Sequence, residues 1–375
     1  MNKLNILIIT YYWPPSGGSG VQRWMFFAKY LKQFGHNPII ITVDPKYASY
    51  NLIDNSLIDQ VKDIEAHKTA SFEILKLYSI FKSGNKNRAI PQSYIPTQSF
   101  FDKIASFIRL NFFIPDSRIG WNYFAFKKAK KLIEENNINC VITTGPPHSS
   151  HLIGKKIYNK FKLKWIVDLR DPWAELFYLK NKFQFNYVKK LNLKFELDVL
   201  NSADAILTTV GNRYKTILRH KLSNTNKIYK IYNGYDKIAY DKIEEIKPDS
   251  YNIVFTGILS KNHNYQLFLE VLSLLKDKYK DLNMIFTFAG KIDKKIKNLF
   301  SEKIQFIDNG YVTHKEAIKI IKSSHLLINF NYLNTEDTDM VSGKLIEYLA
   351  SGSPIINFSN SVSYTHLRAH ETVRN

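Results

Sequence analysis

Short apolar runs alternate with amphipathic stretches along most of the chain. The first run, residues 4–10, precedes a loop rich in proline and glycine, and a helical pattern with one apolar face then continues to Gly35. The same order of strand, turn and helix recurs through the rest of the chain. Because this alternation is typical of parallel sheets with crossover helices, we predict an α/β fold.

Two series of such units are separated by a charged segment. Residues 1–235 form the first series, although 44–99 show little beyond long loops with short helices. Residues 236–250 lack a strand pattern and are predicted to be an inter-domain linker. Residues 251–361 form the second series. The predicted architecture is two doubly wound, Rossmann-like domains, with a ligand in the cleft at the carboxyl ends of their strands.

Composition narrows the class of protein. The 375 residues leave room for two domains, and a hydrophobic content of 45% excludes a disordered chain. The single cysteine, Cys140, excludes an internal disulfide framework and a metal site built from cysteines. Since the sequence displays neither a secretory signal nor an apolar run long enough to span a bilayer, we expect a cytoplasmic protein.

The net charge of +20 suits nucleic acid, an anionic membrane surface or a phosphorylated substrate as partner. A general bias toward lysine explains part of this charge, so it does not choose among the three. Residues 100–118 combine aromatic and basic side chains, among them Phe112, Phe113 and Arg118. This stretch either docks peripherally on the anionic inner face of the plasma membrane or packs as ordinary helix core.

Glycines follow the first predicted strand. Gly17 and Gly18 lie in a loop where the backbone can approach a ligand and the next helix offers free N–H groups. The loop has neither the third glycine of a dinucleotide fingerprint nor the Gly-Lys-Ser/Thr of a Walker loop. It is therefore either a ligand-binding turn or a plain strand-to-helix turn.

Two polar clusters follow later strands of the first series. His148, in the sequence TGPPHSSH, stands at the start of a predicted helix and suits hydrogen bonds to sugar hydroxyls. Asp168, Arg170 and Asp171 follow another strand in the sequence DLRDPW. These three charges suit either contacts to a polar acceptor or a structural ion pair, and Asp171 is also placed to cap the next helix.

The second series carries residues suited to a nucleoside diphosphate. Gly257 and Lys261 follow its first strand, an arrangement suited to a diphosphate clamp. Gly343 and Lys344 open a later helix, where backbone amides and the lysine ammonium can face a phosphate together. Glu347, one turn further along that helix, is placed to accept two ribose hydroxyls.

Together these motifs resemble the retaining glycosyltransferases of the GT-B fold, the family-4 group. That group carries two acidic residues separated by seven positions in its donor domain. Asp339 and Glu347 keep the spacing, but the first is an aspartate here in place of the usual glutamate. The group also tends to have an arginine soon after the position of Gly257, whereas Ile258 follows here, which leaves Lys261 to act alone or with Lys344.

The resemblance implies transfer of a sugar from a nucleoside diphosphate donor to a glycan or lipid-linked acceptor, with retention, in cell-envelope polysaccharide synthesis. In such a mechanism the donor phosphate helps to deprotonate the acceptor, so stabilising charge on the diphosphate matters more than a protein base. No metal ion and no cofactor are expected. The implied roles are phosphate for Lys261 and Lys344, ribose for Glu347, donor sugar for Asp339, and transferred sugar and acceptor for His148 and the loop of Gly17 and Gly18.

Two alternatives stay open. A nucleotide-sugar 2-epimerase of the same fold would bind the same donor, but it needs a paired acid and base that the sequence does not display. A basic, non-enzymatic protein that binds membranes or polyanions would explain the charge but not the nucleotide-binding motifs. Nucleic acid is not expected as a partner.

The end of the chain departs from the composition of the rest. Residues 362–375 contain two arginines, two histidines and no lysine, although lysine, asparagine and isoleucine dominate elsewhere. We expect this segment to be a non-native tail joined to a second domain that lacks its last elements. The transferase interpretation then describes the parent protein.

Overall fold

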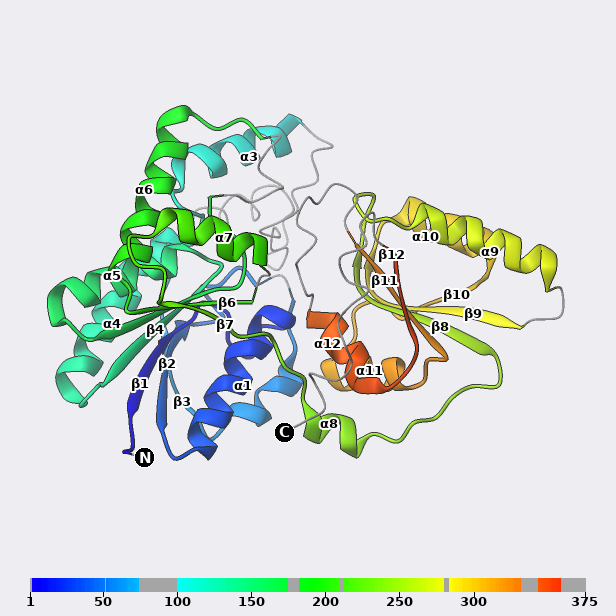
Figure 1. Cartoon of the computed structure of the whole chain (residues 1–375), viewed down its shortest axis with the longest axis horizontal. Coiled ribbons are helices and arrows are strands. Elements are labelled where there is room, and N and C mark those ends of the chain that lie inside the picture. The colour runs from blue at the N-terminus through cyan, green and yellow to red at the C-terminus, as the bar shows by residue number, and fades with distance from the viewer. Residues whose placement is uncertain are drawn as a thin grey trace. The chain divides into compact units, whose positions relative to one another are not determined.

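The chain divides into two units, Met1–Tyr232 and Asn233–Asn375, and each is built around its own sheet (Figure 1). The computed structural model describes residues 2–50, 52–73, 100–174, 182–209, 212–279, 283–331 and 343–358.

A seven-stranded parallel sheet with the order β3-β2-β1-β4-β5-β6-β7 forms the centre of the first unit. The chain winds outward in opposite directions from the neighbours β1 and β4, and ligands of doubly wound sheets bind at such a switch point. The strands are β1 (Asn5–Ile9), β2 (Asn37–Val43), β3 (Glu65–Thr69), β4 (Cys140–Gly145), β5 (Lys164–Leu169), β6 (Ala205–Thr208) and β7 (Ile228–Lys230).

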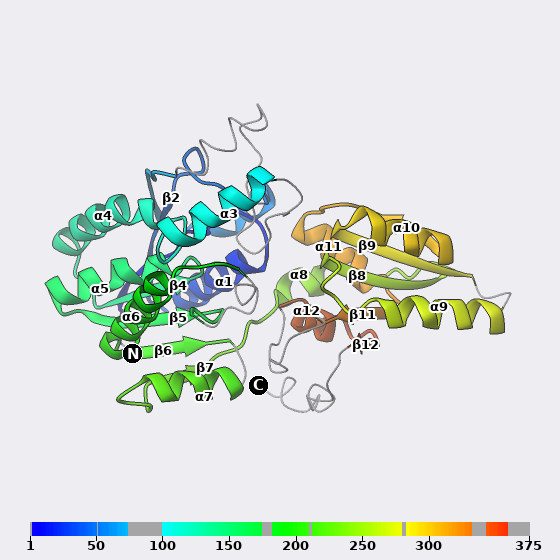
Figure 2. The same ribbon diagram turned by 90° about the horizontal axis from the view of Figure 1, so that it is seen from above.

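Helices cover both faces of this sheet because the side chains of its strands alternate between two cores. Leu7 and Ile9 of β1 pack under α4, α5 and α6, which lie side by side, whereas Ile6 and Ile8 pack under α1 (Figures 1 and 2). The helices are α1 (Ser19–Gln33), α3 (Phe100–Phe112), α4 (Asn122–Glu135), α5 (Ser149–Phe161), α6 (Asn186–Ser202) and α7 (Asn212–Lys221), with short 3-10 turns at Asn55–Leu57, Asp59–Val61 and Ile119–Trp121.

A five-stranded parallel sheet with the order β10-β9-β8-β11-β12 forms the centre of the second unit. One face packs a phenylalanine-rich core that includes Phe268 of α9 and Phe300 of α10, and the other packs Ile321 of α11 and Tyr348 of α12. The strands are β8 (Tyr251–Leu259), β9 (Met284–Ile292), β10 (Gln305–Asp308), β11 (Leu326–Phe330) and β12 (Ile355–Phe358). The helices are α8 (Lys237–Lys242), α9 (Gln266–Lys278), α10 (Lys294–Lys303), α11 (His314–Lys322) and α12 (Gly343–Ser351).

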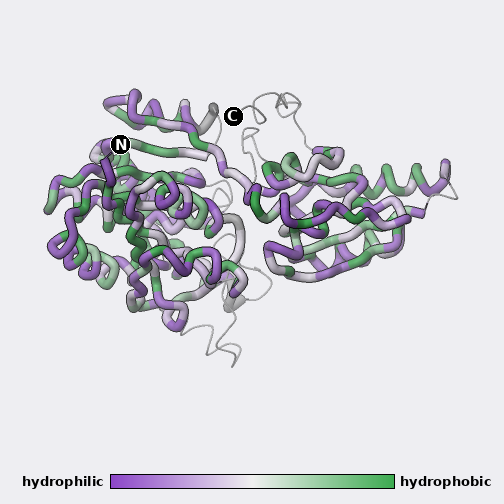
Figure 3. The backbone as a smooth tube through the Cα atoms, turned by 90° about the horizontal axis from the view of Figure 1, so that it is seen from below, coloured by the Kyte–Doolittle hydropathy of each residue, from purple (hydrophilic) through white to green (hydrophobic). Residues whose placement is uncertain are grey.

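The predicted fold class is confirmed, since both sheets are parallel and wound on both sides by helices. Figure 3 shows hydrophilic and hydrophobic positions alternating along the outer helices, which is the pattern on which the prediction rested. Residues 362–375 lie outside the described part of the chain, so the expected tail stays a prediction.

Two local expectations need correction. Part of the predicted linker 236–250 is the helix α8, whose Tyr240 is buried and whose backbone oxygens at Tyr240 and Ile243 accept hydrogen bonds from Lys322 of α11. Within the stretch where only loops and short helices were expected, β3 pairs in register with β2. Its sequence, Glu-Ala-His-Lys-Thr, is polar because the strand lies at the sheet edge and is mostly exposed.

Candidate functional site

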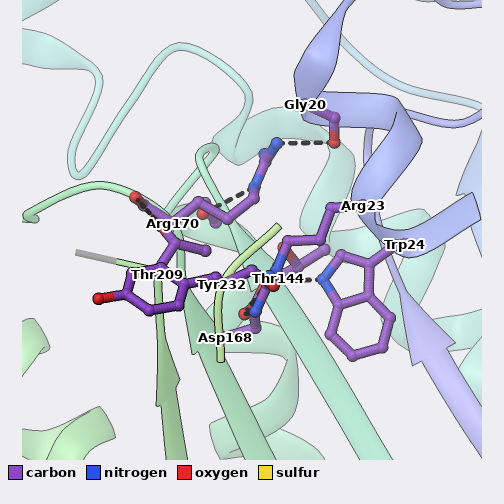
Figure 4. Close-up of polar contacts among 9 residues, drawn as sticks. Gly20, Arg23, Trp24, Thr144, Asp168, Arg170, Thr209 and Tyr232 are labelled. Carbon is purple, nitrogen blue, oxygen red and sulfur yellow. Dashed lines mark hydrogen bonds and ion pairs between the residues drawn. The ribbon is translucent and has the colours of Figure 1, made fainter. Parts of the chain in front are cut away.

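A buried polar network lies at the carboxyl end of β5 (Figure 4). The Asp168 carboxylate accepts hydrogen bonds from Trp24 Nε1 at 2.6 Å, from Thr144 Oγ1 at 2.9 Å and from the Arg23 guanidinium at 2.9 Å. Arg23 and Asp168 form an ion pair with both side chains inaccessible to solvent, and Arg23 also donates to the Tyr232 carbonyl. Asp168 is therefore satisfied inside the first unit, where it fastens α1 to the sheet.

Arg170 joins three segments at the same edge of the sheet. Its guanidinium donates to the Gly20 carbonyl at 2.7 Å, to the Gly145 carbonyl at 3.2 Å and to the Pro146 carbonyl, while its own carbonyl accepts from Thr209 Oγ1 (Figure 4). A Cβ atom on Gly20 would lie 2.5 Å from Arg170 Nη1, so only glycine allows this approach. Arg170 thus positions the loops after β1, β4 and β6.

The loop of Gly17 and Gly18 starts α1, as predicted. Gly18 occupies the N-cap position with a φ of 93°, a backbone conformation that favours glycine. The Gly17 amide donates to the Leu52 carbonyl at 3.0 Å, which ties the loop to the following segment. Contact of this loop with a donor stays a prediction.

Asp171 differs from its two charged neighbours because its half-buried carboxylate accepts no hydrogen bond within the described residues. Burial raises its pKa, the charge of Arg170 opposes this, and the charge of Asp168 adds to it. Burial also lowers the pKa of Arg170. Of the two carboxylates among the acceptor-side candidates, Asp171 is the one without a hydrogen bond from the described residues.

His148 and His151 pack against the same indole. The His148 ring stacks on Trp173 with centroids 5.0 Å apart, and the His151 ring lies 5.6 Å from it. Burial lowers the pKa of His148 well below its ordinary range and that of His151 to about 3, so both imidazoles are neutral at pH 7. Neutral imidazoles offer one donor and one acceptor each, which suits sugar hydroxyls.

Several nitrogens of these imidazoles are buried. His151 Nδ1 bonds to Thr143 Oγ1 at 2.9 Å, but its Nε2 is buried without a hydrogen-bond partner in the described structure. Both nitrogens of His148 are buried as well, and the backbone of Pro172 is the one hydrogen-bonding group of the described residues that raises the pKa of this imidazole. A Cβ atom on Gly145 would lie 2.5 Å from His151 Nε2 and 2.8 Å from His148 Nδ1. The absence of a side chain at Gly145 therefore makes room for both rings at the end of β4.

Three glycines line the carboxyl ends of the strands in the second unit. Gly257 of β8 and Gly290 of β9 pair in register with φ angles of 117° and 142°, and a Cβ atom on Gly290 would overlap the Gly257 carbonyl. The Gly290 amide donates to the Gly310 carbonyl at 2.6 Å. This edge of the sheet consequently presents backbone instead of side chains.

Lys344 reaches this glycine edge from the first turn of α12. Its Nζ lies 4.2 Å from the centroid of the Phe255 ring and 3.6 Å from the place that a Cβ atom of Gly257 would take. Burial lowers its pKa to about 8. In the described part of the chain the ammonium has no carboxylate partner, so its charge is balanced by an aromatic face alone.

Glu347 lies one turn further along α12 and is held at two points. His314 Nε2, at the start of α11, lies 2.8 Å from Glu347 Oε1. Tyr240 of α8 donates its hydroxyl proton to the Glu347 backbone carbonyl at 2.9 Å. The structure thus brings Gly257, Lys344 and Glu347 to one edge of the second sheet.

The turn after β8 does not bring Lys261 to this cluster. Lys261 is exposed and has no hydrogen bond or ion pair with the described residues, so its phosphate role stays a prediction. His263, two residues later, is buried with its Nδ1 3.1 Å from the Ser260 amide nitrogen. Burial and then the charge of Lys344 lower the pKa of His263 to about 4.

Asp339, the proposed donor-sugar residue, lies outside the described residues. Within those residues, no group of three histidine, cysteine, aspartate or glutamate side chains is arranged to hold a metal ion. No helix among them is both long enough and apolar enough to cross a bilayer.

Sequence comparison relates the second unit to a known protein family. Residues 250–370 match the family described as Glycosyl transferases group 1. This stretch, about a third of the chain, is similar to a group 1 glycosyltransferase domain. No curated protein sequence matches the chain.

Solved structures show that the chain has the two-domain GT-B fold. Starch synthase IV from Arabidopsis thaliana, bound to ADP and acarbose, is similar with a TM-score of 0.58 at 10% identity, over 95% of this chain and 83% of that chain. TarM of S. aureus gives 0.57 at 10% identity, over 96% and 85%. HepE of Anabaena, in complex with UDP-glucose, gives 0.56 at 10% identity, over 94% and 80%.

Two residues of the glycosyltransferase domain were missed in the sequence. His314 is the first residue of α11, and Gly290 lies near the carboxyl end of β9, where it pairs with Gly257. The start of a helix that follows a strand could have pointed to His314, as it did for Lys344.

Proposed function

We propose that the protein transfers a sugar from a nucleoside diphosphate donor to a glycan or lipid-linked acceptor, with retention, in the synthesis of a cell-envelope polysaccharide. The observation that carries the proposal is Lys344, whose ammonium lies beside Gly257 without a counter-ion among the described residues, in a stretch that matches the group 1 glycosyltransferases. The similar structures of HepE and starch synthase IV hold UDP-glucose and ADP.

A diphosphate suits the surroundings of Lys344. Its negative charge would supply the partner that the ammonium lacks among the described residues, at a place where partial burial makes a charge pair stronger than in water. The missing side chain at Gly257 lets phosphate oxygens approach the end of β8, and the free amides of a helix N-terminus such as that of α12 favour an anion. Donor binding should therefore depend on Lys344 more than on exposed lysines such as Lys261.

The reaction breaks the bond between the anomeric carbon and the diphosphate oxygen. A bond from the acceptor oxygen to the anomeric carbon forms on the same face, and the acceptor proton passes to the departing diphosphate. Negative charge grows on the diphosphate, where Lys344 and the α12 amides stabilise it more strongly in the transition state than in the ground state. We therefore propose that transfer needs no divalent metal, with Asp339 near the donor sugar.

In this proposal, polar groups of the first unit bind the hydroxyls of the transferred sugar and of the acceptor. We propose that His148 hydrogen-bonds the transferred sugar through a ring nitrogen and that the Asp171 carboxylate accepts from the acceptor. Arg170 supports both, because it fixes the loop that ends at Pro146 and the start of α1. Asp168 supports His148 and Asp171 indirectly, because its ion pair with Arg23 holds α1 against β5.

An exposed aromatic patch supports a membrane-associated acceptor. Phe107 of α3 stacks on Phe183 with ring centroids 6.0 Å apart. Asn111, also on α3, connects the helix to the segment of Phe183 by donating a hydrogen bond to the Phe183 carbonyl. Phe112 and Phe183 are nevertheless 63% and 66% exposed. This patch, formed by Ile104, Phe107, Ile108, Phe112, Phe183 and Tyr187, leaves more aromatic surface open to water than a packed core would.

Basic residues border the aromatic patch. Lys103 of α3 and Lys189, Lys190 and Lys194 of α6 are exposed. Apolar rings flanked by lysines bind anionic bilayers through combined insertion and charge attraction. We propose that the patch docks on the inner face of the plasma membrane, where a lipid-linked acceptor is presented.

A thermal-shift screen tests the donor assignment. Sugars linked to UDP, GDP and ADP are each added to the wild-type chain and to Lys344→Ala, Glu347→Ala and Lys276→Ala, the last an exposed lysine on α9 as matched control. We expect one nucleotide class to stabilise wild type and Lys276→Ala, because a ligand that binds only the folded state raises its stability. The proposal fails if no nucleotide sugar stabilises the wild type, or if Lys344→Ala and Glu347→Ala respond fully.

A further inference from the structure

Among the proposed donor-binding side chains of the second unit, the Glu347 carboxylate is held by a direct contact with another side chain, His314. His314 Nε2 lies 2.8 Å from Oε1, and the two side chains are 8% and 16% exposed. No hydrogen bond reaches Oε2 from the described residues. One carboxylate oxygen is thus engaged by the protein, and the other is left for a ligand.

The His314 imidazole is not needed to start its own helix. His314 is the first residue of α11, but Thr313 and Glu316 form a reciprocal capping box that satisfies the helix N-terminus. The imidazole can therefore serve Glu347, to which it donates from Nε2 whether it is neutral or charged. Neither a sequence motif nor helix capping accounts for the contact between His314 and Glu347. We infer from this that His314 orients the Glu347 carboxylate.

We propose that His314 is a positioning residue that fixes the Glu347 carboxylate for recognition of the ribose 2′- and 3′-hydroxyls of the donor. This inference rests on the ribose role proposed for Glu347. A glutamate side chain has three rotatable torsions, and a ligand that must order such a side chain loses about 0.5–1.5 kcal/mol, or roughly 2- to 12-fold in affinity. His314 removes this loss by holding the carboxylate before the ribose arrives.

The backbone of Glu347 has its own support, independent of His314. The Tyr240 hydroxyl donates to the Glu347 carbonyl, and Lys322 of α11 fastens α8 through two backbone carbonyls. Loss of the imidazole should consequently free the carboxylate without moving α12. The proposal therefore predicts an effect confined to ribose hydroxyls and not a general loss of nucleotide binding.

Calorimetric titration of UDP, GDP and ADP, each against its 2′-deoxy counterpart, tests this directly on the full chain. The variants are His314→Phe, which removes the donor, His314→Gln, which keeps an N–H donor, and Glu347→Gln. His325→Phe is the matched control, because His325 lies in the same unit at the opposite, amino-terminal edge of the sheet, stacked on Tyr251.

For the nucleotide that the wild type prefers, we expect His314→Phe to weaken the ribonucleotide about 2- to 12-fold and the deoxynucleotide less than about 2-fold. His314→Gln and His325→Phe should stay near wild type, and adding Glu347→Gln to His314→Phe should cost little more than Glu347→Gln alone. Equal losses for both nucleotides, or full discrimination in His314→Phe, would overturn the positioning role.

The same titrations separate this inference from the proposed function. If the wild type binds none of the three nucleotides, the donor site itself is refuted. If the wild type discriminates and Glu347→Gln does not, while His314→Phe still does, only the inference about His314 fails. Should His314→Phe not fold, His314→Ala replaces it, and its ratio of ribonucleotide to deoxynucleotide affinity is read in the same way.

Discussion

Lys344 Nζ lies 4.2 Å from the centroid of the Phe255 ring, and in the described structure no carboxylate balances its charge. An aromatic face attracts an ammonium but replaces only part of the water that burial removes. Burial therefore lowers the pKa of Lys344 to about 8, which brings its titration into an accessible range. A site that holds a cation in this way is prepared for an anionic ligand.

Donor affinity should fall as the pH rises through 8. The charged ammonium binds the diphosphate, and its fraction in the free protein drops about 10-fold between pH 7 and pH 9 if its pKa is about 8. Calorimetric affinities for the preferred nucleotide should weaken by that factor in the wild type and in Lys276→Met. Lys344→Met should bind weakly at both values, without this slope; equal wild-type affinity at pH 7 and pH 9 would argue against the assignment.

Asp168 and Asp171 should respond in opposite ways to neutralisation. Asp168→Asn leaves the buried Arg23 guanidinium without its counter-charge, so we expect a loss of about 3–5 kcal/mol in the free energy of unfolding. Asp171→Asn breaks no hydrogen bond within the described residues and removes a charge whose burial is unfavourable, so stability should stay within about 1 kcal/mol while transfer slows. Urea unfolding of the two variants measures this; equal losses would remove the distinction between a structural and an open carboxylate.

Gly145→Ala should impair transfer while leaving donor binding intact. The added methyl would lie 2.5 Å from His151 Nε2, so the imidazoles must shift, and misplacement of a binding group by about 1 Å can cost on the order of 100-fold in rate. Gly234→Ala is the control, since no atom lies within 4 Å of its added methyl. Steady-state rates and nucleotide titrations are compared; a Gly145→Ala variant with wild-type turnover would dissociate the histidines from function.

Vesicle flotation should show whether the aromatic patch binds membranes. Phe112→Glu and Phe183→Glu together place two negative charges on exposed rings of the patch, so recovery with anionic vesicles should drop severalfold. Tyr123→Glu, at an equally exposed ring on α4, is the matched control and should float like the wild type. If the double variant floats equally well, the patch packs against something other than lipid.

The fold could be predicted from the sequence because buried parallel strands are apolar runs that polar helices separate. The pattern of apolar and polar residues did not predict two elements, because their composition does not reflect how deeply they are buried. The polar edge strand β3 was missed, and α8 was taken for a linker because its charged residues hide the burial of Tyr240. Both elements depend on partners distant in sequence, which a local pattern does not display.

The candidate site was predictable to the extent that ligand groups follow strand ends. Gly257 was found in this way, and Lys344 and Glu347 were found at the start of a predicted helix. The support of these residues was not predictable, because His314 and Phe255 reach them only through the folding of separate elements. Likewise, nothing in DLRDPW distinguishes the saturated Asp168 from the open Asp171.

Anomeric NMR of the turnover product distinguishes retaining sugar transfer from inversion and from epimerisation. The wild-type chain is incubated with the nucleotide sugar selected by the thermal screen and with candidate glycan or lipid-linked acceptors, and the donor and product anomeric signals are compared. We expect a new glycosidic linkage with the donor's configuration, formed by wild type and Lys276→Ala but not by Lys344→Ala. Inversion at the anomeric carbon, a change at C2 without transfer, or unimpaired turnover by Lys344→Ala would contradict it.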